Sequence, residues 1–317
     1  MAISKSNMLP QTIQWLKTLW KFSRPHTIIG TSLSVTGLAI MALAADAAAR
    51  ANFNWLPFLG AIATALVPSL CANLYIVGLN QLEDVDIDRI NKPALPLASG
   101  EFSRKEGLMI VGVTGALSLV LSAIQGMSLW LTVLLSVVIG TAYSLPPFRL
   151  KRFPFWAALC IFGVRGIIVN LGFFLHFQQY LGGTQRLSAE VWALTAFVIL
   201  FAFAIAIFKD IPDAEGDRQF KINTLTIRLG TRSVFDISRW VLTACYGLMI
   251  GATALGLIAV QPLFLLLTHV GLLVWLWICS TKVNVKDKRQ ISQFYQFIWQ
   301  LFFLEYILFP LACLWKG

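Results

Sequence analysis

The sequence is organised as a series of long apolar stretches separated by short polar segments. Each stretch is close to the ~20 residues that an α-helix needs to cross the hydrocarbon core of a bilayer. The chain is 57% hydrophobic and only 13% charged, a composition that excludes an ordinary soluble domain. We therefore expect an all-α, polytopic membrane protein with nine transmembrane helices. The expected spans are 26–45, 55–79, 107–125, 128–145, 154–178, 189–209, 237–257, 262–281 and 293–315.

The basic residues gather in alternate polar segments. Of the 25 lysines and arginines, all but Arg50, Arg165, Arg186 and Lys316 fall on one predicted side of the membrane. The positive-inside bias makes that side cytoplasmic, or stromal in a plastid-like compartment, and places the N-terminus there. The net charge of +10 is then explained by topology and anionic lipid headgroups, so the expected surroundings are a lipid bilayer and no nucleic acid. The sequence identifies no protein partner.

Two acid-rich segments lie at the cytoplasmic ends of the second and sixth apolar stretches. They run over residues 80–89 and 209–218 and contain more than half of the chain's 15 acidic residues. Carboxylates clustered beside hydrocarbon repel one another and lose hydration, so a cation must offset the cost. We expect this cation to be Mg²⁺ carrying a phosphate ester, because Mg²⁺ takes a few carboxylates together with substrate phosphates.

The first acidic segment has a helical spacing. If the second span remains helical through it, Asn80, Asp84 and Asp88 share one face at i, i+4 and i+8, whereas Asp86 points away. An amide with two carboxylates suits Mg²⁺ better than Zn²⁺, because no His or Cys joins them. A solvated helix end would explain this segment equally well if it stood alone.

The second acidic segment repeats the spacing at Asp213 and Asp217. Asp210 precedes them, but Pro212 disfavours a helical residue before it. Gly216 allows another backbone to approach closely. Two such motifs at matching span ends predict one shared site, with four aspartates as the catalytic residues: Asp84, Asp88, Asp213 and Asp217. The expected metal ligands are Asn80, Asp84, Asp88, Asp210, Asp213 and Asp217.

The two motifs also indicate an internal repeat, because the same offset separates Asp84 from Asp213 and Asp88 from Asp217. We expect two four-helix repeats plus one helix around a central cavity, within a single domain over residues 1–317.

A bound diphosphate also needs basic or hydroxyl partners, although each basic candidate can equally be a positive-inside anchor. The candidates are Lys92, Tyr143, Lys151, Arg152 and Lys209, with Arg149 also near the site.

Four ionisable residues lie well inside spans and away from their ends, where such groups usually face the protein interior and pair. Arg165 and Glu305 are one candidate pair, with substrate contact as the alternative role. His176 shares that ambiguity. His269 is expected to be a hydrogen-bonded core histidine.

The motifs Asn80-xxx-Asp84-xxx-Asp88 and Asp210-xx-Asp213-xxx-Asp217, on this helical scaffold, resemble those of the intramembrane aromatic prenyltransferases of the UbiA superfamily. The resemblance covers essentially the whole chain. Within the superfamily, the segments 80–84, 91–93, 95–101 and 209–217 resemble homogentisate prenyltransferases of tocopherol (vitamin E) synthesis.

This resemblance implies that Mg²⁺ held by both motifs binds the diphosphate of an allylic prenyl donor and promotes its departure. An electron-rich aromatic acceptor then attacks the cation-like fragment. The implied reaction is transfer of a phytyl group from phytyl diphosphate to homogentisate, with release of diphosphate and CO₂. The acceptor carboxylate needs a cation, for which Arg24, Lys92 and Arg152 are candidates, and aromatic side chains would line the cavity: Phe201, Phe203 and Phe208.

Two alternatives remain at this point. Inside the superfamily, the chain could be a chlorophyll synthase or another quinone-pathway prenyltransferase. Outside it, an ion-coupled secondary transporter would place its coupling carboxylates near mid-membrane, whereas these acids lie at span ends. P-loop, GxGxxG, HExxH and GxSxG motifs are missing from the sequence. No chloroplast-type leader precedes the first span, so we expect a cyanobacterial inner or thylakoid membrane.

We expect the N-terminus and both acidic segments to face one side of the membrane and the C-terminus to face the other. The test uses cysteines engineered into the 99–104 and 182–186 segments of a variant without native cysteines. An impermeant reagent should label the two segments from opposite sides. Labelling of both segments from one side contradicts the topology.

Overall fold

The computed structural model describes residues 11–183, 186–220, 222 and 224–315, and most of these residues are helical. The first half contains α1 Gln11–Phe22, α2 Pro25–Ala45, α3 Ala47–Ala51, α4 Trp55–Glu83, α5 Val85–Asn91, α6 Pro96–Ser99, α7 Arg104–Ala123 and α8 Met127–Ser144. The second contains the 3₁₀-helix η1 Leu150–Arg152, α9 Pro154–Phe162, the π-helix η2 Gly163–Ile168, α10 Val169–Tyr180, α11 Ala189–Phe208, α12 Asp210–Gln219, α13 Leu225–Leu229, α14 Thr231–Ala254, α15 Pro262–Thr281 and α16 Lys288–Leu314.

The expected all-α membrane architecture is confirmed. In the described part of the chain, eight helical segments are long and apolar enough to cross a bilayer, and they match eight of the expected spans within a few residues. The continuous segment Pro154–Tyr180, which joins α9, η2 and α10, counts as one of them. The remaining expected span corresponds to α14, whose 24 residues begin with a charged portion containing Arg232, Asp236 and Arg239. The count of nine therefore stays a prediction.

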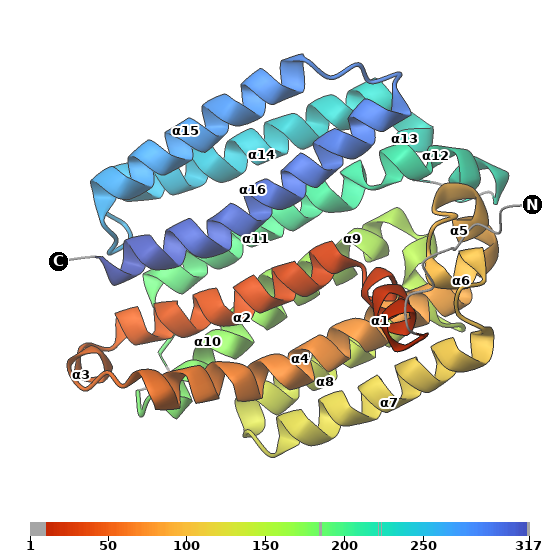
Figure 1. Cartoon of the computed structure of the whole chain (residues 1–317). Coiled ribbons are helices and arrows are strands. Elements are labelled where there is room, and N and C mark those ends of the chain that lie inside the picture. Colours follow the sequence, from red (N-terminus) through yellow and green to blue (C-terminus); the bar gives the residue numbers. More distant parts are fainter. Residues whose placement is uncertain (1–10, 184–185, 221, 223, 316–317) are drawn as a thin grey trace, which may run out of the picture.

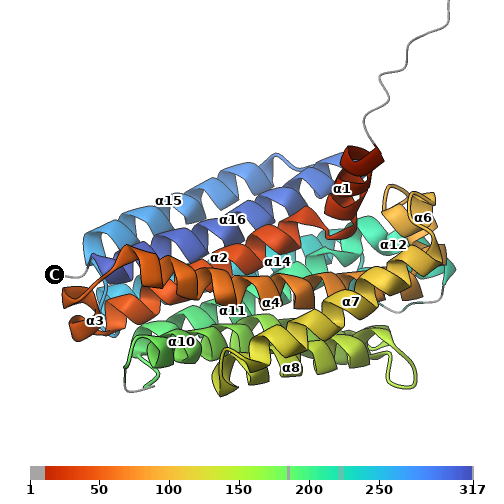
Figure 2. The same ribbon diagram turned by 60° about the horizontal axis from the view of Figure 1, so that its bottom comes forward.

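The long helices run side by side along one direction (Figures 1 and 2), and Figure 1 shows them in two groups. One group contains α11, α14, α15 and α16, and the other contains α2, α4, α7, α8 and α10. Helix α2 packs against both α16 and α4, so it joins the two groups. The short helices α5, α6, α12 and α13 lie together at one end of the bundle. Both acidic segments are therefore at the same end, as their spacing along the chain predicts.

The in-span ionisable residues do not pair as expected. Oε2 of Glu305 lies 3.1 Å from Nε2 of His269, and both side chains are fully buried between α15 and α16. Nδ1 of the same histidine contacts the Leu265 carbonyl at 3.0 Å, which confirms a hydrogen-bonded core histidine. The expected Arg165–Glu305 pair is wrong, because the guanidinium of Arg165 instead stacks on aromatic rings.

We expect removal of one partner of the His269–Glu305 pair to destabilise the protein more than removal of both. His269→Leu leaves a buried carboxylate unpaired, which costs ~3–5 kcal/mol, whereas replacing a whole buried pair by apolar groups is often neutral. Thermal unfolding of the purified protein in detergent measures the difference. The double variant His269→Leu/Glu305→Leu is the control, and a double variant less stable than the single one would contradict the prediction.

Candidate active site

A cavity of about 1560 Å³ extends from α5 and α12 into the bundle. Its outer part is lined by the acidic segments and by basic side chains. Its inner part is lined by small and apolar side chains, among them Ala72, Val133, Val169, Phe173 and Phe203. The cavity thus combines a charged mouth with a largely apolar interior, and it lies between helices from both halves of the chain.

The first acidic segment is bent at Asp84. Helix α4 ends at Glu83, the Asp84 backbone has φ −111° and ψ 17°, and α5 begins at the next residue. The expectation of an unbroken helix is therefore wrong. The amide of Asp84 still donates to the Asn80 carbonyl at 3.1 Å, and the amide of Asp88 donates to the Asp84 carbonyl at 2.7 Å. Because these i→i−4 bonds persist across the bend, all three side chains line the cavity.

The carboxylate of Asp84 is held by cations from the loop that follows α8. Nζ of Lys151 lies 2.7 Å from its Oδ1, and Nη2 of Arg149 lies 3.4 Å from the same atom. Arg149 has a positive φ of 39°, a strained backbone for a residue with a side chain. The strain is tolerated where the loop must turn its basic groups toward the acid.

Asp88 is 6% exposed and has a more distant partner. Its Oδ2 lies 3.8 Å from Nη2 of Arg24, a residue that precedes α2 and also has a positive φ, of 50°. Burial raises the pKa of Asp88, and the charge of Arg24 opposes that rise. By contrast, the carboxylate of Asp86 is 77% exposed and pairs with Arg89. Asp86 nevertheless also lines the cavity, so the predicted separation of the two faces holds for exposure and not for access to the cavity.

The second acidic segment forms α12. The helix begins at Asp210, so the expectation of a non-helical residue before Pro212 is wrong. Proline is tolerated here because the first turn of a helix has no intrahelical acceptor for its amides. Asp213 pairs with Lys92 from the end of α5, which joins the two motifs. Burial, together with the carboxylates of Asp210 and Asp213, raises the pKa of Asp217 to about 7.

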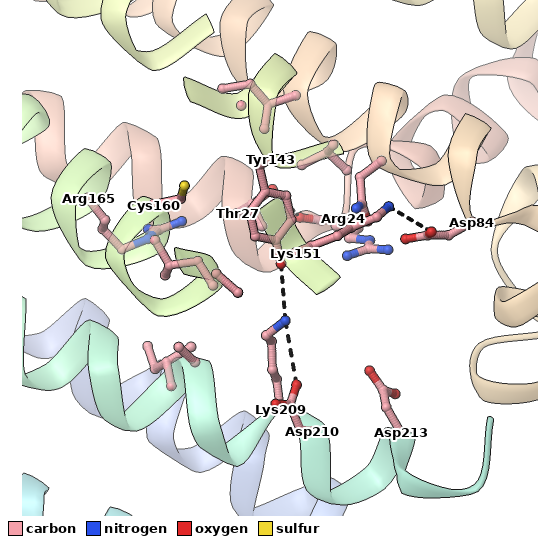
Figure 3. A pocket seen from close by; sticks show the side chains of 18 of the residues that line it. Arg24, Thr27, Asp84, Tyr143, Lys151, Cys160, Arg165, Lys209, Asp210 and Asp213 are labelled. Carbon is pink, nitrogen blue, oxygen red and sulfur yellow. Dashed lines mark hydrogen bonds and ion pairs between the residues drawn. The ribbon is translucent and has the colours of Figure 1, made fainter. Parts of the chain in front are cut away.

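Lys209 and Tyr143 connect α12 to α8 at the mouth of the cavity. Nζ of Lys209 lies 3.3 Å from the hydroxyl oxygen of Tyr143 and 3.6 Å from Oδ1 of Asp210. Figure 3 shows this lysine between Tyr143 and Asp210, with Asp84 and Lys151 facing Asp213 across the open space. The two motifs therefore face each other.

A contact between the side chain of Asn91 and the backbone of Gly216 joins the two motifs. Oδ1 of Asn91 accepts a hydrogen bond from the Gly216 amide at 3.0 Å. A Cβ at Gly216 would overlap the side chain of Asn91, which confirms that this glycine allows close approach. Asn91 was missed because its only signal was its position beside Lys92. This contact fixes α5 against α12 and hence one motif against the other.

All the predicted ligands and binding residues line this one cavity: Arg24, Asn80, Asp84, Asp88, Lys92, Tyr143, Lys151, Arg152, Lys209, Asp210, Asp213 and Asp217. Their individual roles remain predictions. Among the aromatic candidates, only Phe203 lines the cavity. Phe201 and Phe208 are fully buried against other rings of the helix core, so a place in the lining is wrong for them.

The donor atoms fit Mg²⁺ held jointly with a phosphorylated ligand. They are carboxylate and amide oxygens, which hard cations prefer. Within the part of the chain that the structure describes, no three His, Cys, Asp or Glu side chains converge as in a closed metal site. Such an arrangement suits an ion that takes one or two carboxylates and completes its shell with phosphate oxygens and water.

Comparisons with known proteins agree with this geometry. The chain is similar to the homogentisate phytyltransferase of Synechocystis sp., with 52% identity over 95% of this chain and 96% of the relative. It is also similar to the homogentisate geranylgeranyltransferase of Hordeum vulgare, with 38% identity over 93% of this chain and 72% of the relative. The fold resembles a solved UbiA homolog from Archaeoglobus fulgidus bound to GPP and Mg²⁺, with TM-score 0.62, 17% identity, and 94% and 99% of the two chains covered. The sequence profile of the UbiA prenyltransferase family matches residues 33–301, and the chain belongs to that family.

Proposed function

We propose that this protein transfers a phytyl group from phytyl diphosphate to homogentisate, releasing diphosphate and CO₂, as a step of tocopherol synthesis. The observation that carries the proposal is the cavity itself, in which two acidic motifs face each other above an apolar interior. The charged mouth suits a metal-bound diphosphate, and the interior suits a long hydrocarbon chain. The 52% identical relative is named for this donor and this acceptor, which supports both choices.

The residues at the mouth divide into metal ligands and phosphate ligands. Asn80, Asp84 and Asp88 would hold Mg²⁺ from one side, and Asp210, Asp213 and Asp217 from the other. Mg²⁺ bound there would supply neutralising charge to the departing diphosphate. The lysines that now pair with carboxylates would turn to phosphate oxygens, with Arg152 beside them at the cavity wall. The lysines concerned are Lys92, Lys151 and Lys209.

The interior of the cavity would hold the prenyl chain and exclude water from the reacting carbon. Phe173 and Phe203 line this part, and their rings present negative π faces to a developing positive charge. Exclusion of water matters because water would compete with the aromatic acceptor for the prenyl cation.

The buried acid–base pair elsewhere in the membrane supports prenyl transfer over ion-coupled transport. A transporter needs its coupling carboxylate to reach the substrate pathway. Glu305 and His269 are fully buried and are not among the residues that line the cavity. The carboxylates that do line it lie at helix ends, where a diphosphate can enter from water.

The positions of the first and last helices at opposite ends of the bundle support nine membrane crossings. Helix α1 lies at the end that carries the acidic motifs, and the last turn of α16 lies at the opposite end (Figures 1 and 2). Only an odd number of crossings separates them, so α14 would be the ninth span, beside α11 and α15. With the positive-inside bias, the acidic end faces the cytoplasm. The membrane would be a cyanobacterial inner or thylakoid membrane.

We expect Asp84→Ala and Asp213→Ala each to reduce prenyl transfer by roughly 100-fold or more, because each removes a carboxylate that would hold the Mg²⁺ that neutralises the leaving group. Asp86→Ala is the matched control, since it removes the same group from the same segment at an exposed position. Transfer of radiolabelled phytyl to homogentisate by purified protein measures both. Full activity in Asp84→Ala contradicts the metal site, and equal losses in all three variants contradict the shared face.

We expect the protein to discriminate more strongly between aromatic acceptors than between prenyl donors. A buried polar site can reject an acceptor that lacks a matching group by orders of magnitude. The two donors differ only in the saturation of an apolar chain of equal length, a smaller change than the loss of a matching polar group, and even a whole methylene is worth only ~1–3 kcal/mol. We expect homogentisate to be strongly preferred over 4-hydroxybenzoate, with geranylgeranyl diphosphate accepted as a poorer donor than phytyl diphosphate. Specificity constants for the four combinations test this. Preferred prenylation of 4-hydroxybenzoate or chlorophyllide would overturn the acceptor assignment.

A further inference from the structure

Arg165 lines the cavity from an unusual stretch of backbone. It lies on the π-helix η2, within the continuous membrane segment Pro154–Tyr180. Single turns of π-helix inside α-helices occur frequently at functional sites. Figure 3 shows the Arg165 side chain directed from this helix toward the middle of the cavity. The backbone irregularity therefore coincides with a charged group in the substrate space.

The charge of Arg165 is not compensated by a carboxylate in the described part of the chain. Its Cζ lies 5.2 Å from the ring centroid of Trp299 and 5.4 Å from that of Phe302. Arg24, Arg149, Lys92 and Lys151 at the cavity mouth lie instead within ion-pair distance of an aspartate. A guanidinium within a membrane segment is costly unless it meets an anion or water, so this cation is available to an anionic ligand.

The depth of Arg165 separates it from the acidic motifs. A Cβ built on Gly30 would lie 3.3 Å from its Nη1, so the guanidinium packs at the level of that residue. Gly30 is five residues beyond Pro25, or about 8 Å along α2 at 1.5 Å per residue. The Arg24–Asp88 contact lies at the start of the same helix. A ligand anion at Arg165 is therefore a different group from a diphosphate held at the mouth.

We propose that Arg165 binds the carboxylate of the aromatic acceptor, an arylacetate, while the diphosphate of the donor occupies the mouth. This inference rests on the proposed function and assigns to Arg165 the role expected of Arg24. The planar guanidinium offers paired N–H donors to a carboxylate, and the two rings behind it hold its plane. Trp299 also lines the cavity and contacts the ring of His26 at a centroid distance of 4.8 Å, which provides an aromatic wall beside the anion.

The experiment compares homogentisate with its neutral amide, 2,5-dihydroxyphenylacetamide, in the full-length protein. Equilibrium binding of radiolabelled homogentisate, and competition by the amide, are measured in wild-type protein, Arg165→Met and Arg165→Lys. We expect wild-type protein to bind the acid roughly 10- to 100-fold more tightly than the amide, as for other charged hydrogen bonds. This preference should vanish in Arg165→Met and return in part in Arg165→Lys. KM for homogentisate should rise more than kcat falls, with KM for phytyl diphosphate unchanged.

Arg239→Met is the matched control. Arg239 also stacks on a tryptophan, with its Cζ 4.4 Å from the Trp277 ring centroid, but it pairs with Asp236 and lies outside the cavity lining. Its loss should leave the acid-to-amide preference intact.

If wild-type protein prenylates homogentisate but shows no such preference, or if Arg165→Met retains it, the inference is overturned and the proposed function stands. If wild-type protein does not prenylate homogentisate at all, the proposed function fails first. If Arg165→Met does not fold, the acid-to-amide preference of wild-type protein and its partial loss in Arg165→Lys test the inference.

Discussion

The repulsion among buried carboxylates at the mouth of the cavity is the constraint on which the rest of this structure depends. Asp88 and Asp217 are each only 6% exposed, and burial raises the pKa of both. Cations must therefore come from other parts of the chain. The irregular backbone supplies them, because Arg24 and Arg149 both adopt positive φ beside the acids that they face. Local strain of order 1–3 kcal/mol at each position is tolerated for this electrostatic balance.

The long helices serve a different purpose from the irregular mouth. Their small side chains let helices approach closely, and their apolar faces enclose a cavity whose inner wall includes Phe173 and Phe203. Two sets of ionisable groups in this region have different neighbours. His269 pairs with Glu305 away from the cavity, whereas Arg165 faces the cavity and rests on aromatic rings. The fold thus keeps the buried His269–Glu305 pair apart from Arg165, whose charge is open to ligands in the cavity.

Sequence patterns predicted the spans and the residues of the acidic motifs because both depend on local periodicity. Asn80 and Asp84 still lie on the same face despite the bend, because the i→i−4 hydrogen bonds continue through it. Contacts between helices distant in the sequence left no such pattern. The bond from Gly216 to Asn91 depends on how α12 meets α5. The partner of Glu305 could not be predicted either, because composition alone does not show which helices are neighbours.

The order of the ionic partners along the chain affects how the protein can be made. Lys92 leaves the ribosome well before Asp213, so this acid finds its cation already inserted. Asp84 precedes Lys151, and the short helices α5 and α6 and the hairpin of α7 and α8 lie between them. Translation proceeds at ~5–20 residues per second, and the hairpin therefore delays pairing by only seconds. Asp84 and Asp213 are thus each paired soon after synthesis, and the nascent chain can assemble its charged end progressively instead of awaiting the last helix.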